Sequence, residues 1–382
     1  MSGSTATPVV TGYGAVTAYG TGVEKLWKAL VEGQSPATNW SPEDSPDTFR
    51  AGPIGDNYRP HPRIPRNLAH FLDRGSMIGL DAALQAVEAA GLTAGIADSR
   101  RFAVTDGLAF RAPGQATLFV PYGQLVARAL GVRGKVMSLT GAESSGLSAI
   151  AEAAGIVAQG EADVVVAGAA QALQPAVLAH LAQQDMIAPE EAHPLDAHPN
   201  GCIPAEGAAY IVVESENHAR ERGATIHARI AGATRTFDPL AEPLDPSDAT
   251  EAGRSMQAAL GAAGYLQNQV DHVASCADGR AYRDASDAVG LTRTFGRHVY
   301  YASVTAPAGA LGQTLAASGP LAMTYALEAM RLQQVAPTAG FQESPERSDL
   351  SIVRKTREER LDCILVTSLG LGGSNASVLL QR

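Results

Sequence analysis

Residues 135–170 read KVMSLTGAESSGLSAIAEAAGIVAQGEADVVVAGAA, and from Lys135 onward the chain alternates between two types of sequence pattern. Short, largely apolar runs at 135–140 and 162–170 predict two strands. The alanine-rich run between them, at 144–160, predicts a helix. A strand, a helix and a second strand in this order are typical of a layered α/β protein.

The same alternation continues outward in both directions. Further strands are expected at 9–12, 208–215, 272–278, 298–304 and 363–369. Further helices are expected at 22–33, 77–90, 217–223, 255–264 and 320–333. The Pro-, Asp- and Asn-rich residues 35–70 predict a surface excursion. Periodicity alone allows one doubly wound sheet or two sheets with helices between and outside them.

Charge and composition exclude several classes of partner. The chain has 29 Lys and Arg against 39 Asp and Glu, a net charge of −10, and no long basic run. Nucleic acid and anionic membrane are therefore poor partners. No apolar stretch approaches the length of a membrane span, and residues 1–16 lack the pattern of a signal peptide. We expect a protein of the cytoplasm.

The cysteines predict neither a disulfide framework nor a metal site. Cys202, Cys276 and Cys363 are odd in number, far apart and without paired spacing. A reducing compartment fits this usage. We expect no metal and no cofactor.

Four separated segments resemble those of the β-ketoacyl synthase family. Residues 9–35 are similar to the strand, glycine turn and helix at the start of that family. Residues 193–232 resemble the stretch with its Pro-Phe-Asp and Gly-Glu-Gly-Ala signatures, and 368–380 resemble its glycine-rich ending. Residues 140–173 match the strand, nucleophile elbow and helix of the family. The resemblance implies an α/β protein with the thiolase-like, duplicated, five-layered α-β-α-β-α fold. It also implies two intimately packed halves, 1–235 and 236–382.

The resemblance places Glu143 where a working ketosynthase carries its acyl-accepting cysteine. A thiolate at a helix N-terminus is a good nucleophile, because the helix dipole favours the charged, reactive form. A carboxylate gains from the same dipole but cannot form the thioester. Glu143 therefore cannot hold a growing acyl chain by the chemistry of the family.

The other catalytic positions have changed as well. By the resemblance, Cys276 and Gln313 replace the two histidines, Ala308 replaces the lysine, and Leu371 replaces the gating phenylalanine. The two imidazoles stabilise the enolate and the oxyanion in such enzymes, and neither replacement can do so. Nearby His272 is interpreted as a packing residue.

This coordinated loss resembles the chain length factor, the ketosynthase β subunit of a type II polyketide synthase. The segments 277–288 and 306–341 look like that subfamily. The resemblance implies a protein without catalytic residues that forms a heterodimer with a ketosynthase α subunit. Such a protein shapes the polyketide tunnel and so controls the chain length made by decarboxylative condensation on acyl carrier protein. The carrier, with its phosphopantetheine-bound acyl chain, would dock mainly on the α subunit.

Candidate tunnel and interface residues follow from the same resemblance, which places the strand at 135–140 at the dimer interface. They are Phe110, Leu118, Phe119, Tyr122, Met137, Leu139 and Leu371. Ordinary core roles remain open for Phe110, Leu118, Phe119 and Tyr122. An acidic carrier protein would need a local basic patch, because the net charge of the chain is negative. The candidates for that patch, which scattered solvated arginines would equally explain, are Arg63, Arg66, Arg74, Arg100, Arg101 and Arg111.

Two questions stay open at this point. Glu143 either caps the helix by accepting backbone N–H bonds or pairs with Ser144, Ser145 or an arginine. The chain itself could instead be a divergent acyltransferase or thiolase-like enzyme, with Glu143 as general base and Cys276 as nucleophile. A homodimeric scaffold with the ketosynthase fold is a further alternative.

Overall fold

The computed structural model describes residues 6–43, 46–64, 66–69, 72–92, 98–109, 121–239, 250–346 and 348–382. The strands of the first half are β1 (Pro8–Thr17), β5 (Phe102–Leu108), β6 (Val136–Thr140), β7 (Val164–Gln171) and β8 (Gly207–Ser215). Its helices are α1 (Val23–Glu32), α2 (Arg66–Ala69), α3 (Arg74–Ala89), α4 (Tyr122–Leu130), α5 (Ser145–Ala158), α6 (Pro175–Gln183) and α7 (Glu216–Glu221).

The strands of the second half are β9 (Ala228–Phe237), β10 (His272–Ala274), β11 (Ser303–Thr305), β13 (Ser351–Ile352), β15 (Cys363–Leu369) and β16 (Ser374–Gln381). Its helices are α8 (Thr250–Ala263), α9 (Ala281–Phe295), α10 (Ala308–Leu311) and α11 (Ser318–Leu332). Short strands complete the chain: β2 (Gly20–Thr21), β3 (Thr38–Trp40), β4 (Phe49–Ala51), β12 (Gln334–Val335) and β14 (Arg357–Glu358).

The two halves repeat one topology. The order in the first is β6-β5-β7-β8-β1, and the order in the second is β11-β10-β15-β16-β9, with β13 added beside β11. In each half, the first three strands of this order are parallel and the last two are antiparallel to their neighbours. Two residue pairs between β1 and β9 join the halves. The repeat confirms the duplicated fold, whereas one doubly wound sheet does not describe it.

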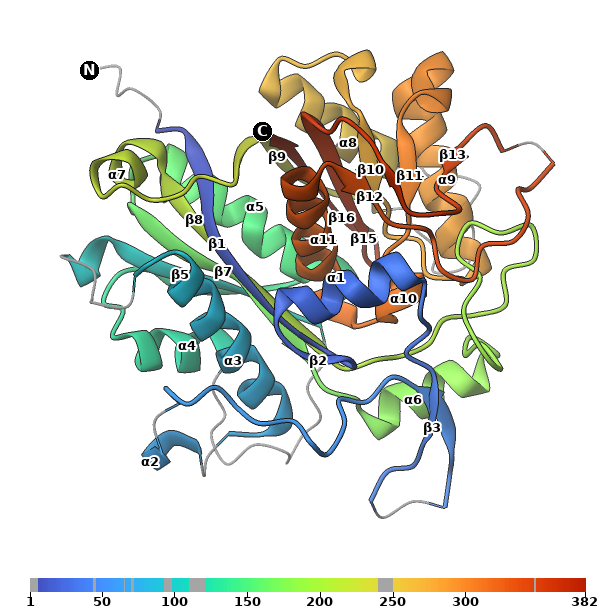
Figure 1. Cartoon of the computed structure of the whole chain (residues 1–382), viewed down its shortest axis with the longest axis horizontal. Helices are drawn as coiled ribbons and strands as arrows, with labels where there is room; N and C mark the ends of the chain where they lie inside the picture. The colour runs from blue at the N-terminus through green and yellow to red at the C-terminus, as the bar shows by residue number, and fades with distance from the viewer. Residues whose placement is uncertain are drawn as a thin grey trace.

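The five layers follow from helix contacts. Helices α5 and α11 lie between the two halves of the sheet, since α5 contacts β5, β7, β9 and β16, and α11 contacts β8 and β15 (Figure 1). On the outer faces, α3 packs on β1 and β8, and α8 packs on β9 and β16. The division into two units at 235/236 stays a prediction; that boundary falls inside β9.

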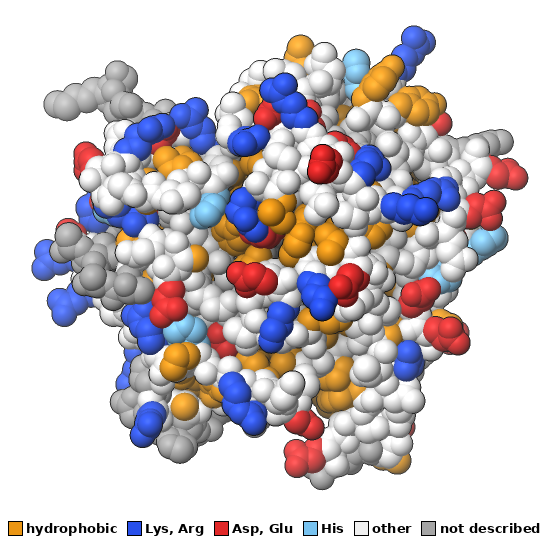
Figure 2. All heavy atoms as spheres, in the orientation of Figure 1, with side chains coloured by type: hydrophobic (Ala, Val, Ile, Leu, Met, Phe, Trp, Pro, Cys, Tyr) orange, Lys and Arg blue, Asp and Glu red, His pale blue; other side chains and the backbone are white. Residues whose placement is uncertain are grey.

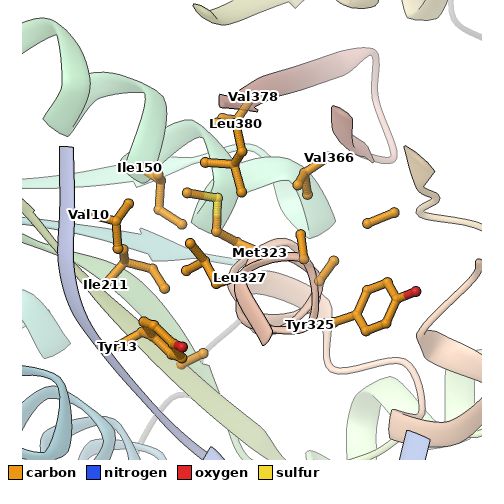
Figure 3. Packing of buried hydrophobic residues seen from close by; sticks show 14 of the residues in the cluster. Val10, Tyr13, Ile150, Ile211, Met323, Tyr325, Leu327, Val366, Val378 and Leu380 are labelled. Atoms are coloured by element: carbon orange, nitrogen blue, oxygen red, sulfur yellow. The ribbon is translucent and has the colours of Figure 1, made fainter. Parts of the chain in front are cut away.

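The main core lies in the central layer. Figure 3 shows Met323 and Leu327 of α11 among side chains of both halves of the sheet, including Ile211 and Leu380. Helix α5 is buried around most of its circumference because sheet covers it on two sides. A helix in such a place needs small apolar residues all round, which explains the alanine-rich sequence at 144–160.

The first strand is longer than its sequence pattern suggests. The expected strand at 9–12 ends in a glycine turn, but β1 continues to Thr17. A Cβ atom on Gly12 would lie 2.4 Å from the carbonyl oxygen of Ala86, and one on Gly14 would lie 2.5 Å from that of Ala82. These glycines therefore allow α3 to approach the strand closely rather than turn the chain.

Other expectations are confirmed or corrected. Helices α1 and α3 confirm the helices at 22–33 and 77–90. The expected strand at 298–304 is wrong over its first half: 296–300 form a 3₁₀ turn, and only Ser303–Thr305 pair in the sheet. Of the aromatic residues there, Tyr301 is exposed, so the run is not a buried strand. Within the described ranges, no helix combines the length and the apolar character needed to cross a bilayer.

Candidate functional site

The site begins at a sharp turn between β6 and α5. The chain leaves β6 through Gly141 and forms a 3₁₀ turn, Ala142–Ser144, before α5 starts. Ala142 has φ of 49°, a left-handed conformation that is uncommon for a residue with a Cβ atom. The strained elbow that presents a nucleophile is thus retained, and it carries Glu143 into the interior.

The carboxylate of Glu143 is bound by two arginines and one backbone group. Its Oε1 lies 3.0 Å from Nη2 of Arg280 and 3.7 Å from Nη1 of Arg283. Its Oε2 accepts a hydrogen bond of 2.9 Å from the N–H of Leu371. The helix-cap hypothesis is therefore wrong, because its bonding partners come from distant segments and not from the first turn of α5. Ser144 and Ser145 donate instead to carbonyl oxygens of the elbow.

Asp278 completes a buried ion cluster with these residues. Its Oδ2 lies 2.6 Å from Nη2 of Arg280 and 3.3 Å from Nε of Arg283. It also accepts a hydrogen bond from the side-chain amide of Gln313. We call Glu143, Asp278, Arg280 and Arg283 the ion cluster; no member is more than 3% exposed.

The acidic and basic members of the ion cluster keep one another in their charged forms. Burial alone would raise the pKa of Glu143, but the charges of Arg283 and Arg280 and the N–H of Leu371 hold it below its usual range. The same balance lowers the pKa of Asp278. Burial opposes the charge on Arg280, yet the neighbouring anions keep its pKa well above the ordinary value. Two cations therefore face two anions.

Asp284 anchors the turn that carries the cluster. Its carboxylate accepts N–H bonds from Leu195 (2.7 Å), Asp278 (2.9 Å) and Gly279 (3.2 Å). Burial, and next the charge of Asp278, raise the pKa of Asp284 to about 7. These bonds explain why the expected strand at 272–278 ends at Ala274 and the chain turns into the cluster.

Three other positions that the sequence motifs assigned to the site lie close together in the structure. Cys276, Ala308 and Gln313 line one small cavity of about 20 Å³, room for roughly one water molecule. Burial and then the nearby Asp287 raise the pKa of the Cys276 thiol, which is the opposite of what a reactive thiolate needs. Glu143 does not line this cavity. The geometry therefore argues against Glu143 and Cys276 as a base and a nucleophile.

Gln313 and Leu371 are held in place by hydrogen bonds. The side-chain oxygen of Gln313 accepts bonds from the N–H of Leu315 (2.8 Å) and the hydroxyl of Ser318 (2.7 Å). Because its side-chain amide also donates to Asp278, the side chain of Gln313 is held at both ends. The N–H of Leu371 binds Glu143, while its side chain is 40% exposed.

The tunnel and interface candidates are only partly described. Phe110, Leu118 and Phe119 lie outside the described residues. Tyr122 is buried in the core cluster beneath α3 and α4. Met137 and Leu139 are half-buried on β6, the end strand of the described sheet.

Three of the six arginines in the expected basic patch are paired with carboxylates. Arg63 lies 3.3 Å from Glu88, Arg74 lies 2.7 Å from Glu206, and Arg101 lies 2.6 Å from Asp163, while Arg111 is outside the described residues. Figure 2 shows basic and acidic side chains interspersed on the face in view. The scattered-arginine interpretation fits these residues better than a patch does.

Sequence reasoning allowed an arginine as partner of Glu143 but did not identify Arg280 and Arg283. Arg280 and Arg283 follow Cys276 closely, where the family motif has small and hydroxyl residues, and three charges in a buried motif were the available signal. His272 is confirmed as a structural residue: it is buried, with Nδ1 2.6 Å from Ser303 Oγ and Nε2 2.9 Å from the Tyr325 hydroxyl. Burial lowers the pKa of His272 to about 3, so the ring is neutral.

The duplicated five-layered fold and the retained elbow define a ketosynthase-like protein. The family model for the β-ketoacyl synthase N-terminal domain matches residues 7–219, and the one for the C-terminal domain matches 227–342. The chain therefore belongs to the β-ketoacyl synthase family.

Named relatives include polyketide and nodulation proteins. The chain is 30% identical over 413 residues to the granaticin polyketide putative β-ketoacyl synthase 1 of Streptomyces violaceoruber, covering 98% of each chain. It is 29% identical to nodulation protein E of Rhizobium leguminosarum bv. trifolii, again over 98% of each. Among solved structures, the ishigamide ketosynthase/chain length factor superimposes with a TM-score of 0.90 at 23% identity, over 99% of each chain.

Proposed function

We propose that this protein is a non-catalytic chain length factor that pairs with a ketosynthase α subunit. One observation carries the proposal: the ion cluster occupies the elbow and the motif after β10, where a ketosynthase holds its cysteine and first histidine. A thioester cannot form on Glu143, and Gln313 cannot replace an imidazole. Loss of one residue would leave other chemistries open, but this loss involves every catalytic position.

The proposed role is steric. The α subunit would hold the growing chain on its own cysteine, and this protein would provide part of the wall of the cavity into which the chain extends. Growth stops when further extension would overpack a dense interior. Such control requires a stable, largely apolar interface between the two chains.

The edge of the sheet supports a place for that interface. Strand β6 is the last strand in the described sheet order, and Met137 and Leu139 are half-buried in the isolated chain. A strand edge with free backbone groups and apolar side chains is normally covered. We propose that β6 faces the α subunit, that the carrier protein docks mainly on that subunit, and that the complex is cytoplasmic.

Two competing functions predict different results. A divergent acyltransferase would carry an acyl group on Cys276, and a homodimeric scaffold would be stable without a partner. The raised thiol pKa of Cys276 and the arginine-bound carboxylate of Glu143 favour the chain length factor over the first alternative. The ishigamide ketosynthase/chain length factor shares the fold, which is compatible with all three.

The test is to co-express the chain with the ketosynthase encoded nearest to it and to add malonyl carrier protein. Intact-protein mass spectrometry should find acyl adducts on the partner's cysteine and none on this chain, and gel filtration should show a one-to-one complex. An adduct on this chain that Cys276→Ala abolishes would instead establish the enzyme. A stable homodimer that ignores every co-expressed ketosynthase would establish the scaffold.

A further inference from the structure

A buried carboxyl group lies in the core of the first half, away from the ion cluster. Asp106, on β5, is fully buried. Its side chain points to the same face of the strand as Phe102 and Val104, because successive side chains of a strand alternate between its two faces. These two neighbours belong to the apolar core beneath α3 and α4. A charge on Asp106 is costly in such surroundings unless other groups compensate it.

Asp106 connects β5 to two neighbouring elements. Ser138 is its partner on β6, and the Ser138 hydroxyl donates to Oδ1 of Asp106 at 2.6 Å. The backbone N–H of Gly123, in the first turn of α4, faces the same carboxyl group. A Cβ atom on Gly123 would lie 2.2 Å from Oδ1, so the helix packs closely on the acid. One side chain therefore contacts β6 and the start of α4 together.

The second oxygen of Asp106 has neither a donor nor access to water. Its Oδ2 has no hydrogen-bond partner among the described residues, and the hydroxyl of Tyr210 on β8 has none either. Both atoms are inaccessible to solvent. Glu143, by contrast, is buried with two arginines and a backbone N–H on its two oxygens. The surroundings of Asp106 therefore do not stabilise a negative charge in the same way.

The residues that face Asp106 from the packed elements include no cation within the described part of the chain. Gly168 is its partner on β7, and the ring of Tyr210 on β8 lies against Gly168, where a Cβ atom would be 2.6 Å from the ring. Tyr122 of α4 interacts with the same tyrosine. Burial raises the pKa of Asp106, and the Ser138 hydroxyl and the Gly123 N–H oppose that effect only in part. The neutral acid is therefore favoured over the carboxylate.

We propose that Asp106 is a pH-sensitive latch, which holds β6 and the start of α4 on β5 as a neutral acid and loosens them when it loses its proton. The ionised group needs water, and water reaches Oδ2 only when the elements around it move apart. Strand β6 is the last strand of the described sheet, so it can move without breaking a second ladder. The latch lies within this chain, and the inference is independent of the chain length factor proposal.

Hydrogen–deuterium exchange of the full chain between pH 5 and 9 tests the latch, after correction for the intrinsic pH dependence of amide exchange. The protonated form is favoured in the closed state, so the protection of the β6 amides should fall as pH rises through the pKa of Asp106. The fall approaches about tenfold per pH unit above that pKa. The amides of β16, in the other half, are the internal reference for changes in global stability. Asp106→Asn cannot ionise and should remove the difference between β6 and β16.

Two further variants separate ionisation from a loss of packing. Asp185→Asn changes an exposed carboxylate at a left-handed position that asparagine also adopts readily, so it is the matched control and should keep the wild-type pH dependence. Ser138→Ala removes a donor that favours the ionised form of Asp106. The fall in protection should therefore begin at a higher pH in Ser138→Ala than in the wild type.

Infrared spectroscopy keeps the test valid if Asp106→Asn fails to fold. The carbonyl band of a protonated carboxyl group is titrated in the wild type and in Ser138→Ala, and a component whose midpoint moves to higher pH in the variant belongs to Asp106. The proposal would be overturned by protection of β6 that follows β16 at every pH, or by the same pH dependence in Asp106→Asn as in the wild type. An acid band whose midpoint is identical in the wild type and Ser138→Ala would also overturn it.

Discussion

Glu143 and Arg280, 137 residues apart in the sequence, form a buried ion pair with 3.0 Å between Oε1 and Nη2. Glu143 stands at the elbow of the first half and Arg280 follows β10 of the second. Burying one of these charges alone would be prohibitive, so each residue requires the other. The elbow and the segment after β10 therefore hold a set of mutually dependent charges.

Glu143→Gln should destabilise the chain by about 3 kcal/mol, because it leaves two buried arginines, Arg280 and Arg283, facing the single negative charge of Asp278. Urea unfolding followed by circular dichroism measures the free energy of unfolding. The contacts of Glu143 lie within this chain, so pairing of the folded variant with the α subunit should persist on gel filtration. Glu161→Gln, at an exposed ion pair with Lys135, is the control and should be unchanged. Equal stability of both variants would contradict the role of the cluster.

Removing both charges should cost less stability than the two single removals added together. The double variant Glu143→Leu with Arg280→Met leaves Asp278 facing Arg283, so the charge balance is kept. We expect its loss of stability to be smaller than the sum of the two single losses by about 1–3 kcal/mol. A double-mutant cycle from urea unfolding gives this coupling energy directly. Strict additivity would show that the two residues act independently.

Stability should fall as pH rises from about 4 to about 7, and level off above that, because of Asp284. Its pKa is about 7 in the folded state against 3.8 ordinarily, so the folded chain binds a proton there that the unfolded chain releases. The stabilising contribution is complete below about pH 4 and is lost as pH rises to 7, with a slope approaching about 1.4 kcal/mol per pH unit. Unfolding of the wild type and of Asp284→Asn between pH 5 and 8 should show this slope in the wild type only. A slope of equal size in both would assign it to another group.

Gly12→Ala should destabilise the chain by about 1–3 kcal/mol, since its Cβ would collide with the Ala86 carbonyl of α3. Gly261→Ala, on α8, is the matched control because a Cβ there meets nothing within 4 Å. In a helix that change should be neutral or stabilising by up to about 1 kcal/mol. Thermal melting compares the two. A neutral Gly12→Ala would mean that α3 can shift away from β1.

Glu143→Cys should not create a ketosynthase. The new thiol would stand at the elbow, but Cys276 and Gln313 still cannot stabilise the enolate or the oxyanion. Carbon dioxide release from malonyl carrier protein by the variant alone should stay at the level of the wild type. Measurable condensation would show that the missing imidazoles are replaced by another group.

The sequence pattern predicted only some of the strands and helices, whereas the resemblance to β-ketoacyl synthases predicted the five-layered architecture. Strands β5, β9 and β16 and helices α4, α6 and α9 were not among the predicted elements. The elbow, Glu143, Cys276, Ala308 and Gln313 follow from motifs aligned along the chain. Three of these positions indeed meet in one cavity. The predicted strand at 298–304 and the predicted glycine turn after Gly12 were wrong for the same reason. The sequence pattern of a segment does not show which other segments it packs against.

The bonding partners of Glu143 could be identified only from the tertiary structure. The sequence was compatible with three partners for the Glu143 carboxylate: backbone N–H groups of the helix, a serine or an arginine. Any of these can provide the hydrogen bonds that a carboxylate needs. Burial removes water as an option, and the fold brings Arg280, Arg283 and the N–H of Leu371 to the elbow from the other half of the chain. Local sequence thus determines which groups are lost, whereas long-range packing determines which charges replace them, because the energy of a buried ion depends on every neighbour that surrounds it.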